Sequence, residues 1–380
     1  MGIDEIYVRD KNLNKIGLIE NAESIIWTNR FFECGDFEIY APASKKILNL
    51  CKTGRFLTHK GSKVPMMIEE YKITTDLDGI DYITISGRCA TGLLSRRIIV
   101  DGATRPEEYP SVRIFNLLNN NIIFLPGEAS ELAWADTRRI NKLKFSDELL
   151  ETDKNTYPEG EYLGQNLYQV VTDICKTAGF GIKTHLEFTE DSSGVEKEGS
   201  GYLDIILYSG LDLSKKQNDL PPVVFSPSYG NLAESEYGVS WTNYANTAVE
   251  YMTVSQHGTN VIFQSISSGI TGLNRYETFV NLSDLATTWY DKDFDKYRAL
   301  ADTRVNETLA NHGQNVAFDG KVVFSESFEY GVDYKLGDIV TMENEYGASE
   351  TLRVVEVIES LDSNGYIITP VLKGVTETTN

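Results

Sequence analysis

The sequence predicts a mainly β protein with α+β insertions, in which two related small β-barrel domains accompany two mixed domains. Stretches rich in β-branched and aromatic residues end at Gly, Asn and Asp turns near both ends of the chain. Amphipathic helical spacing is prominent in the interior of the chain instead. The length of 380 residues exceeds what one compact core holds and suits roughly two to four domains.

The two end regions carry variants of one strand-turn-strand module. Each copy has a Gly-led apolar strand, a second strand, an Asp/Gly turn and a third strand, within residues 54–86 and 337–372. Such hairpins build small antiparallel barrels or sandwiches. Chance similarity between β-rich segments is the alternative, since two copies are too few for a solenoid. We expect the copies to superpose as equivalent strands of two barrels, so that a trimer would present six barrel-like units.

The division into domains follows the change from strand patterns to helix patterns and back. The predicted domains are an N-terminal β-barrel over 1–104, an α+β domain over 105–200, a discontinuous second barrel over 201–254 and 315–380, and a mixed insertion with a long helix over 255–314.

Within these domains the individual elements follow from hydrophobic spacing. The strands expected first are Ile3–Val8, Ile16–Ile19, Ile25–Trp27 and Phe37–Tyr40, with a short helix over 43–51. Further helices are expected over 111–119, over 163–178 with Gly179 as its stop, and over 293–311. Later strands are expected at 202–208 and as a hairpin at 248–255 and 261–266. The Gly/Ser-rich loop from Glu190 to Gly201 is expected to be mobile.

The charge is strongly acidic, at −21 with a pI near 4.7. Binding to nucleic acid through phosphates needs a basic surface, so the composition argues against it. An acidic wall that repels passing DNA and an acidic surface kept for solubility fit equally well. Acids of the turn around Asp76, Asp78 and Asp81 are candidates to face such a lumen.

No secretory signal or stable membrane insertion is predicted. The N-terminus is acidic and enters a strand directly, and no apolar run approaches the roughly 20 residues that cross a bilayer. The chain is therefore expected to be made in the cytoplasm.

Cysteine and histidine usage does not indicate a metal or redox centre. Buried free thiols are expected for the four well-separated cysteines, which are Cys34, Cys51, Cys89 and Cys175. Surface or loop positions are expected for the four histidines, which are His59, His185, His257 and His312.

Motifs for catalysis are absent from the sequence: it has no G-x-S-x-G, H-E-x-x-H or Walker loop. The acidic run Asp291-Lys292-Asp293-Phe294-Asp295 resembles the start of a calcium loop, but Lys296 stands where such a loop needs Gly. Capping of a helix N-terminus is the preferred interpretation of these acids. We therefore predict no enzyme activity, no cofactor and no metal site, although paired glycan-cleaving carboxylates cannot be recognised from sequence.

Aromatic residues cluster in two stretches. One contains Trp27, Phe31 and Phe37, and the other begins at Trp241. Sugar-binding platforms have this composition, but so do barrel cores and subunit interfaces. Core or assembly positions are the preferred interpretation of these aromatic residues.

Three segments resemble siphophage-type tail hub or baseplate hub proteins, the family of tail-associated protein N-terminal regions. They are WTNRFFECGDFEI at 27–39, SGRCATGLLSRR at 86–97 and YGVDYKLGDIV at 330–340. The first is similar to the opening of these proteins, the second to the segment that closes their first barrel, and the third to the entry into their last barrel. Because the segments occur in the same order near both ends, the resemblance spans essentially the whole chain.

The resemblance implies a homotrimer whose related barrels form a pseudo-six-fold ring beneath the tail tube. It further implies contacts with the tail tube or a distal tail protein ring, with the C-terminus of the tape measure protein, and with tip, fibre or receptor-binding proteins. The implied role is a virion component that closes the distal end of the tube and passes DNA at ejection. Relatives that carry a hydrolase do so in a C-terminal extension, so we expect no lytic activity from a chain that ends at Asn380.

Two other functions remain open from the residues. One is a carbohydrate-binding tail module that uses the Trp and Tyr clusters, and the other is a cell-wall glycan or peptide hydrolase with unrecognised acids.

Overall fold

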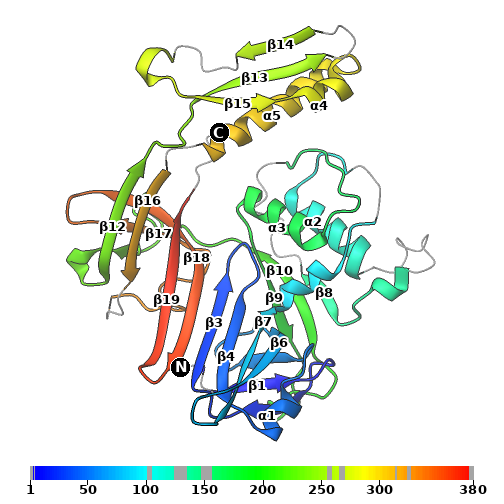
Figure 1. The fold of residues 1–380 in the computed structure, drawn as a ribbon, viewed down its shortest axis with the longest axis vertical. Helices are drawn as coiled ribbons and strands as arrows, with labels where there is room; N and C mark the ends of the chain where they lie inside the picture. The colour runs from blue at the N-terminus through cyan, green and yellow to red at the C-terminus, as the bar shows by residue number, and fades with distance from the viewer. Residues whose placement is uncertain are drawn as a thin grey trace. The chain divides into compact units, whose positions relative to one another are not determined.

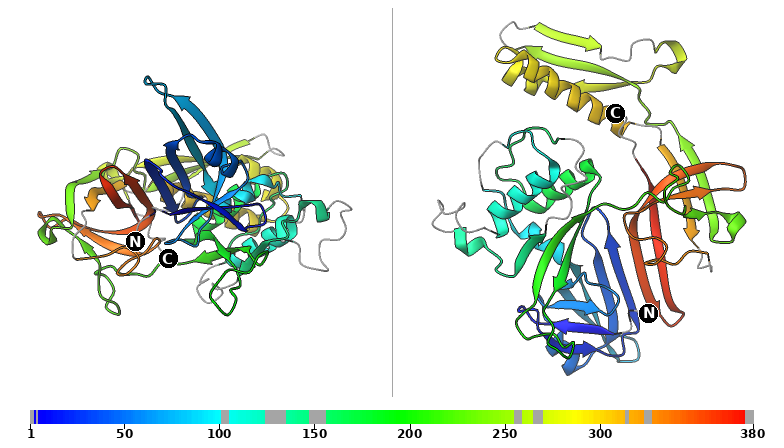
Figure 2. Two further views of the ribbon diagram at one scale, coloured as in Figure 1. Left: turned by 90° about the horizontal axis from the view of Figure 1, so that it is seen from below. Right: turned by 180° about the vertical axis from the view of Figure 1, so that it is seen from behind.

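The computed structural model describes residue 3 and residues 5–100, 105–123, 135–146, 156–254, 259–264, 270–312, 315–322 and 327–375. The chain forms two compact units (Figures 1 and 2). Unit 1 contains residues 1–224, 324–341 and 353–372, and unit 2 contains residues 225–323, 342–352 and 373–380. The division into four domains predicted from the sequence stays a prediction.

One large, mainly antiparallel sheet has most of its residues in unit 1. Its hydrogen-bonded order is β11-β17-β18-β3-β4-β7-β6-β5-β1-β2, with β19 paired to β18. The bounds are β1 Ile6–Arg9, β2 Lys15–Ile19, β3 Ser24–Arg30, β4 Asp36–Pro42, β5 Phe56–His59, β6 Met66–Thr75, β7 Asp81–Cys89, β11 Val224–Phe225, β17 Ile339–Glu343, β18 Ser349–Asp362 and β19 Gly365–Gly374. The mainly β class is thus confirmed. The strand pairings among the described residues leave the sheet open, so closed barrels are not confirmed.

The two predicted modules form strands in the same order. In the first, β5 pairs with β6 and β6 with β7. In the second, β17 pairs with β18 and β18 with β19. Tight turns connect the second and third strands of each, at residues 76–80 and 363–364. Their superposition as two barrels stays a prediction.

Along β4 and β7 the core of this sheet lies on one face, as the alternating pattern predicts. Along β4, for example, Phe37, Ile39 and Ala41 are buried, while the residues between them are more exposed. Ile83 and Ile85 of β7 belong to the same core. The short helix α1 (Lys45–Leu50) forms where expected, with Ser44 as its N-cap.

A second core of unit 1 lies between helices and a three-stranded sheet of order β8-β10-β9 (Figure 1). The helices are α2 (Pro110–Leu118) and α3 (Leu167–Ala178), both close to the predicted ranges, and the strands are β8 (Leu143–Ser146), β9 (Gly181–Glu187) and β10 (Tyr202–Tyr208). The Asn166 side chain accepts hydrogen bonds from Tyr168 N and Gln169 N, and Gly179 is the C-cap. Local capping therefore sets both ends of α3.

Unit 2 contains two smaller sheets. One pairs β12 (Leu232–Ser240) with β16 (Asn315–Val322), although most of unit 2 lies between them in the sequence. The other has the order β14-β13-β15 and packs with α5 (Phe294–Asn311). Its strands are β13 (Thr247–Val254), β14 (Thr259–Gln264) and β15 (Glu277–Asn281), with a short α4 (Ser283–Leu285) after them. The predicted hairpin and long helix are confirmed.

Candidate functional site

The predicted lumen-facing acids occupy the turn between β6 and β7. The Asp76 carboxylate accepts hydrogen bonds from Asp78 N at 2.9 Å and Ile80 N at 2.8 Å. Thr75 Oγ1 donates to the Asp81 carboxylate at 2.6 Å. These acids are exposed and build the turn. Whether they face a lumen stays a prediction.

The predicted aromatic residues fall into two environments. Trp27, Phe31 and Phe37 are buried in unit 1. Trp241 follows β12 in unit 2 and is 48% exposed. Its ring packs against Tyr244 and Tyr276 with centroids 4.7 and 5.6 Å away. Of the predicted aromatic residues, Trp241 alone is therefore accessible to a ligand or partner.

The expectation of surface or loop histidines is wrong for His59. This residue lies in β5, is buried, and packs edge-on against Trp27 with ring centroids 4.8 Å apart. Burial lowers the pKa of His59 to about 4, so it is neutral near pH 7. His185 lies in β9, where burial also lowers its pKa to about 4.

The structure describes one of the remaining two histidines. His312 follows the end of α5, and His257 lies outside the described residues.

All four cysteines are buried and free, as expected. Cys34 and Cys89 are neighbours, and their hydrogen bond raises the pKa of Cys34 while lowering that of Cys89 to about 7. Among the described residues, no group of three or more His, Cys, Asp or Glu side chains is arranged to hold a metal ion. The acid Asp293 instead accepts a hydrogen bond from Lys296 N at the start of α5, as the capping interpretation predicts.

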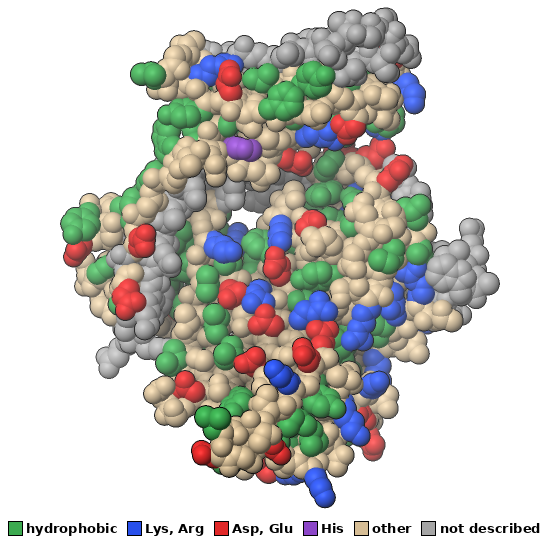
Figure 3. Space-filling model, in the orientation of Figure 1, with side chains coloured by type: hydrophobic (Ala, Val, Ile, Leu, Met, Phe, Trp, Pro, Cys, Tyr) green, Lys and Arg blue, Asp and Glu red, His purple; other side chains and the backbone are tan. Residues whose placement is uncertain are grey.

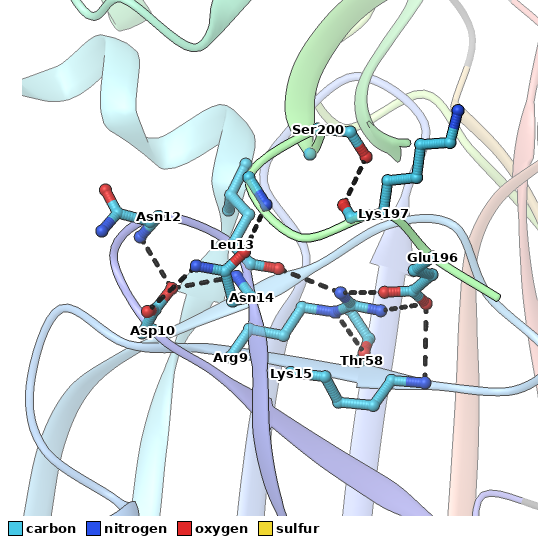
Figure 4. Close-up of polar contacts among 12 residues, drawn as sticks. Arg9, Asp10, Asn12, Leu13, Asn14, Lys15, Thr58, Glu196, Lys197 and Ser200 are labelled. Atoms are coloured by element: carbon cyan, nitrogen blue, oxygen red, sulfur yellow. Dashed lines mark hydrogen bonds and ion pairs between the residues drawn. The ribbon is translucent and has the colours of Figure 1, made fainter. Parts of the chain in front are cut away.

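The predicted mobile loop is held to the N-terminal strands by an ion pair that the sequence did not predict (Figure 4). Arg9 of β1 binds the Glu196 carboxylate with both terminal nitrogens, at 2.7 and 2.8 Å. Its Nε donates to Thr58 Oγ1, and Nη1 donates to the Leu13 carbonyl. Lys15 Nζ lies 3.5 Å from the same carboxylate. We call Arg9, Glu196, Thr58 and Lys15 the Arg9 clamp.

Further hydrogen bonds join the same loop to the turn between β1 and β2. The Asn14 side chain accepts from Gly199 N at 2.8 Å. Lys142 Nζ donates to the carbonyls of Asn12, Gly199 and Gly201. The loop is therefore hydrogen-bonded to the surface of unit 1 through segments far apart in the sequence, and its mobility stays a prediction.

Two motif glycines stand where a side chain would not fit. A Cβ on Gly87 would lie 2.0 Å from the Met67 carbonyl oxygen. Gly337 has φ +99°, and its Cβ would lie 2.4 Å from the Phe31 ring. These close approaches give a physical reason for Gly in the segments 86–97 and 330–340.

Charged side chains of both signs are interspersed on the face of unit 1 seen in Figure 3. The overall charge of −21 is therefore not gathered into one acidic patch on this face. Among the described residues, no helix is long and apolar enough to span a bilayer.

A family model described as siphovirus ReqiPepy6 Gp37-like protein matches residues 5–372. The chain belongs to this family. The resemblance to siphophage tail proteins inferred from three segments is thus confirmed across the whole chain. No curated protein matches the sequence.

The fold of this family member is similar to that of solved prophage and tail proteins. The 43 kDa tail protein of prophage MuSo2 from Shewanella oneidensis is 11% identical with a TM-score of 0.58, and the match covers 97% of this chain and 98% of that one. A tail protein from Neisseria meningitidis MC58 is 13% identical with a TM-score of 0.55, covering 97% and 96%. Prophage tail protein gp18 from Listeria monocytogenes EGD-e is 10% identical with a TM-score of 0.51, covering 98% and 95%.

Family and fold together make this chain a phage tail-like structural protein. The family assignment implies a virion component.

Proposed function

We propose that the protein is a homotrimeric hub that closes the distal end of a phage tail tube and joins it to tip or host-recognition proteins. In this role DNA passes through the ring at ejection, and the tape measure protein ends against it. The hub is assembled in the host cytoplasm.

The observation that carries this proposal is the repeated order of strands. The meander β5-β6-β7 recurs as β17-β18-β19 in the same chain. If each meander completes one barrel in the assembly, three chains supply six similar units to a six-fold tube. The ring symmetry then follows from a repeat inside one chain.

The acidic turn between β6 and β7 gives the proposed lumen a chemical character. Asp76, Asp78 and Asp81 are exposed on a hairpin that extends from unit 1 (Figure 2). DNA carries one negative charge per about 1.7 Å of axis. Acids facing the lumen would therefore repel its phosphates and not bind them. A ring structure with a lumen lined by Lys and Arg would contradict this part of the proposal.

The hub role can be tested by locating the chain in assembled particles. Cryo-electron microscopy of tails should place a ring of this chain at the distal end of the tube. The mass of the purified chain, alone and mixed with its tube protein, should reach that of a trimer. A position at the head, the neck or along the tube wall would overturn the proposal.

Carbohydrate binding is a second candidate function, favoured by the accessible cluster of Trp241, Tyr244 and Tyr276. Accessible aromatic rings suit the apolar faces of sugars. A glycan array would test it, with Trp241→Ala as the variant and Tyr229→Ala, an exposed tyrosine elsewhere, as the matched control. Binding that Trp241→Ala abolishes and Tyr229→Ala retains would establish this function.

A further inference from the structure

The outer half of β6 has an open edge. β7 pairs along the length of β6, from Met66 to Thr75. On the other edge, β5 pairs only with Met66 and Met67, and Ile68 bonds to the backbone of Arg55. Within the described part of the chain, no strand pairs with that edge from Glu70 to Thr75. Exposed strand edges of this kind are templates for pairing with another strand.

The side chains along this edge continue an apolar face of the sheet. Tyr71 lies opposite Ile85 and Ile73 lies opposite Ile83 in the β6–β7 register. Cross-strand partners share a face, and both β7 residues are fully buried. Tyr71 and Ile73 are nevertheless 44% and 45% exposed. The core face of the sheet therefore continues to this edge, where Tyr71 and Ile73 stay partly exposed.

The repeated module shows what covers the equivalent edge in its second copy. β18 is the counterpart of β6, because each is the central strand of its meander. Gly337 and Asp338, just before β17, bond to Val354, and β3 pairs with β18 from Glu356 to Leu361. β3 thus pairs with the outer half of β18, and Arg30 adds an ion pair to Glu356 at 2.5 Å. The outer half of β6 lacks a partner of this kind.

The counterpart of β3 can be identified by the same reasoning. β3 and β4 form the antiparallel pair that precedes the first meander. The antiparallel pair β12–β16 precedes the second meander, so β12 corresponds to β3. β3 uses both edges, for β4 and for β18. β12 pairs with β16 alone among the described strands, so its second edge is open and carries the 47% exposed Val239.

We propose that the open edge of β6, from Glu70 to Thr75, binds the open edge of β12 of a second copy of this chain. This contact would be the same kind of strand pairing between two chains that β18 and β3 form within one chain. Each chain then offers one edge of each kind, so association is head-to-tail and can close into a ring. This proposal deepens the proposed hub by naming its subunit contact, and rests on it in requiring that copies associate.

Cross-linking between singly substituted chains tests the contact directly. Chains carrying Ile73→Cys are mixed with chains carrying Val239→Cys and treated with a short bismaleimide. The native cysteines are buried, so the introduced thiols react first. A two-chain product is expected from the mixture. The control mixture pairs Ile73→Cys with Leu273→Cys, an exposed residue of unit 2 outside β12, and should give none.

Charge on either edge should prevent association, since an edge lysine opposes strand pairing. Ile73→Lys and Val239→Lys should each lose the higher-mass species in sedimentation velocity. Leu77→Lys places the same charge at the exposed tip of the same hairpin and should retain it. Thermal melts matching the parent chain would confirm that each variant is folded.

The outcomes separate this contact from the hub role. Association that survives Ile73→Lys and gives no Ile73–Val239 product would overturn the edge contact and leave the hub proposal standing. A chain that remains monomeric at every concentration, with and without its tube protein, would overturn both. A cross-link to a different tail protein at Ile73, with none between copies, would assign the edge to that protein and likewise overturn this contact.

Discussion

Arg9 and Glu196 lie 187 positions apart in the sequence and form a two-pronged ion pair. The Arg9 side chain is almost fully buried, whereas Glu196 keeps some contact with solvent. Two parallel N–H···O bonds fix both the distance and the orientation of the carboxylate. A loop rich in Gly and Ser therefore acquires a defined position on the N-terminal strands.

Removing the carboxylate of the Arg9 clamp should destabilise unit 1. We expect Glu196→Gln to lower the free energy of unfolding by roughly 1.5–3 kcal/mol, the range for hydrogen bonds to charged groups. Glu198→Gln, an exposed acid of the same loop, should change it by less than about 0.5 kcal/mol. Urea denaturation at pH 7 measures both. Equal stabilities for the two variants would show that the clamp contributes nothing.

The same variant has a defined pH dependence. The hydrogen bond from Arg9 holds the pKa of Glu196 below its usual value. A carboxyl with a depressed folded pKa stabilises above its unfolded pKa, and that contribution is lost as pH falls through the folded pKa. The difference in unfolding free energy between the parent chain and Glu196→Gln should therefore shrink below about pH 4. A difference that persists unchanged at pH 3 would contradict this.

Local signals in the sequence predicted the helices, but contacts between segments far apart in the chain could not be predicted from it. The spacing of Leu167, Val170 and Ile174, with Gly179 behind them, predicted the C-terminal end of α3, but capping by Asn166 starts the helix four residues later than expected. His59 was misplaced because the segment around it is short and polar, and its burial depends on Trp27 from another strand. The partner of Arg9 was not predicted, because nothing local distinguishes Glu196 from its acidic neighbours. The repeat predicted the order of strands within each module, but it did not predict which other strand pairs with each edge of the module.

Buried His59 should make stability depend on pH. Burial lowers its folded pKa to about 4, against about 6.5 when unfolded. The unfolded chain therefore takes up a proton first as pH falls, and stability is lost between about pH 6.5 and 4. His59→Gln should flatten the slope of unfolding free energy against pH in this window. His185 titrates in the same window, so the double variant with His185→Gln should be flatter still. An unaltered slope in both variants would contradict the assignment.

The buried face of α3 should contribute strongly to the second core of unit 1. Leu167 is fully buried, and Leu167→Ala should cost roughly 2–5 kcal/mol through lost burial and a residual cavity. Gln169→Ala on the exposed face of the same helix is the control. Thermal or urea unfolding compares the two. A melt unchanged by Leu167→Ala would mean that this face of α3 is solvated.

Gly87 should be intolerant of a side chain because two strands approach closely there. A Cβ would lie 2.0 Å from the Met67 carbonyl oxygen and 2.9 Å from Glu69 N, both backbone atoms that cannot rotate away. The β6–β7 register shifts between Ile68 and Glu70, just where the paired inner half of β6 gives way to its open edge.

We therefore expect Gly87→Ala to lower the free energy of unfolding by about 1–3 kcal/mol, the usual cost of overpacking. Gly92→Ala is the matched control, because its Cβ would meet atoms only at 3.5 Å or beyond, an ordinary contact distance. Urea denaturation measures both variants. Should Gly87→Ala prove as stable as Gly92→Ala, the strands must separate there at little cost, and the position of the β6 edge would not depend on this close approach.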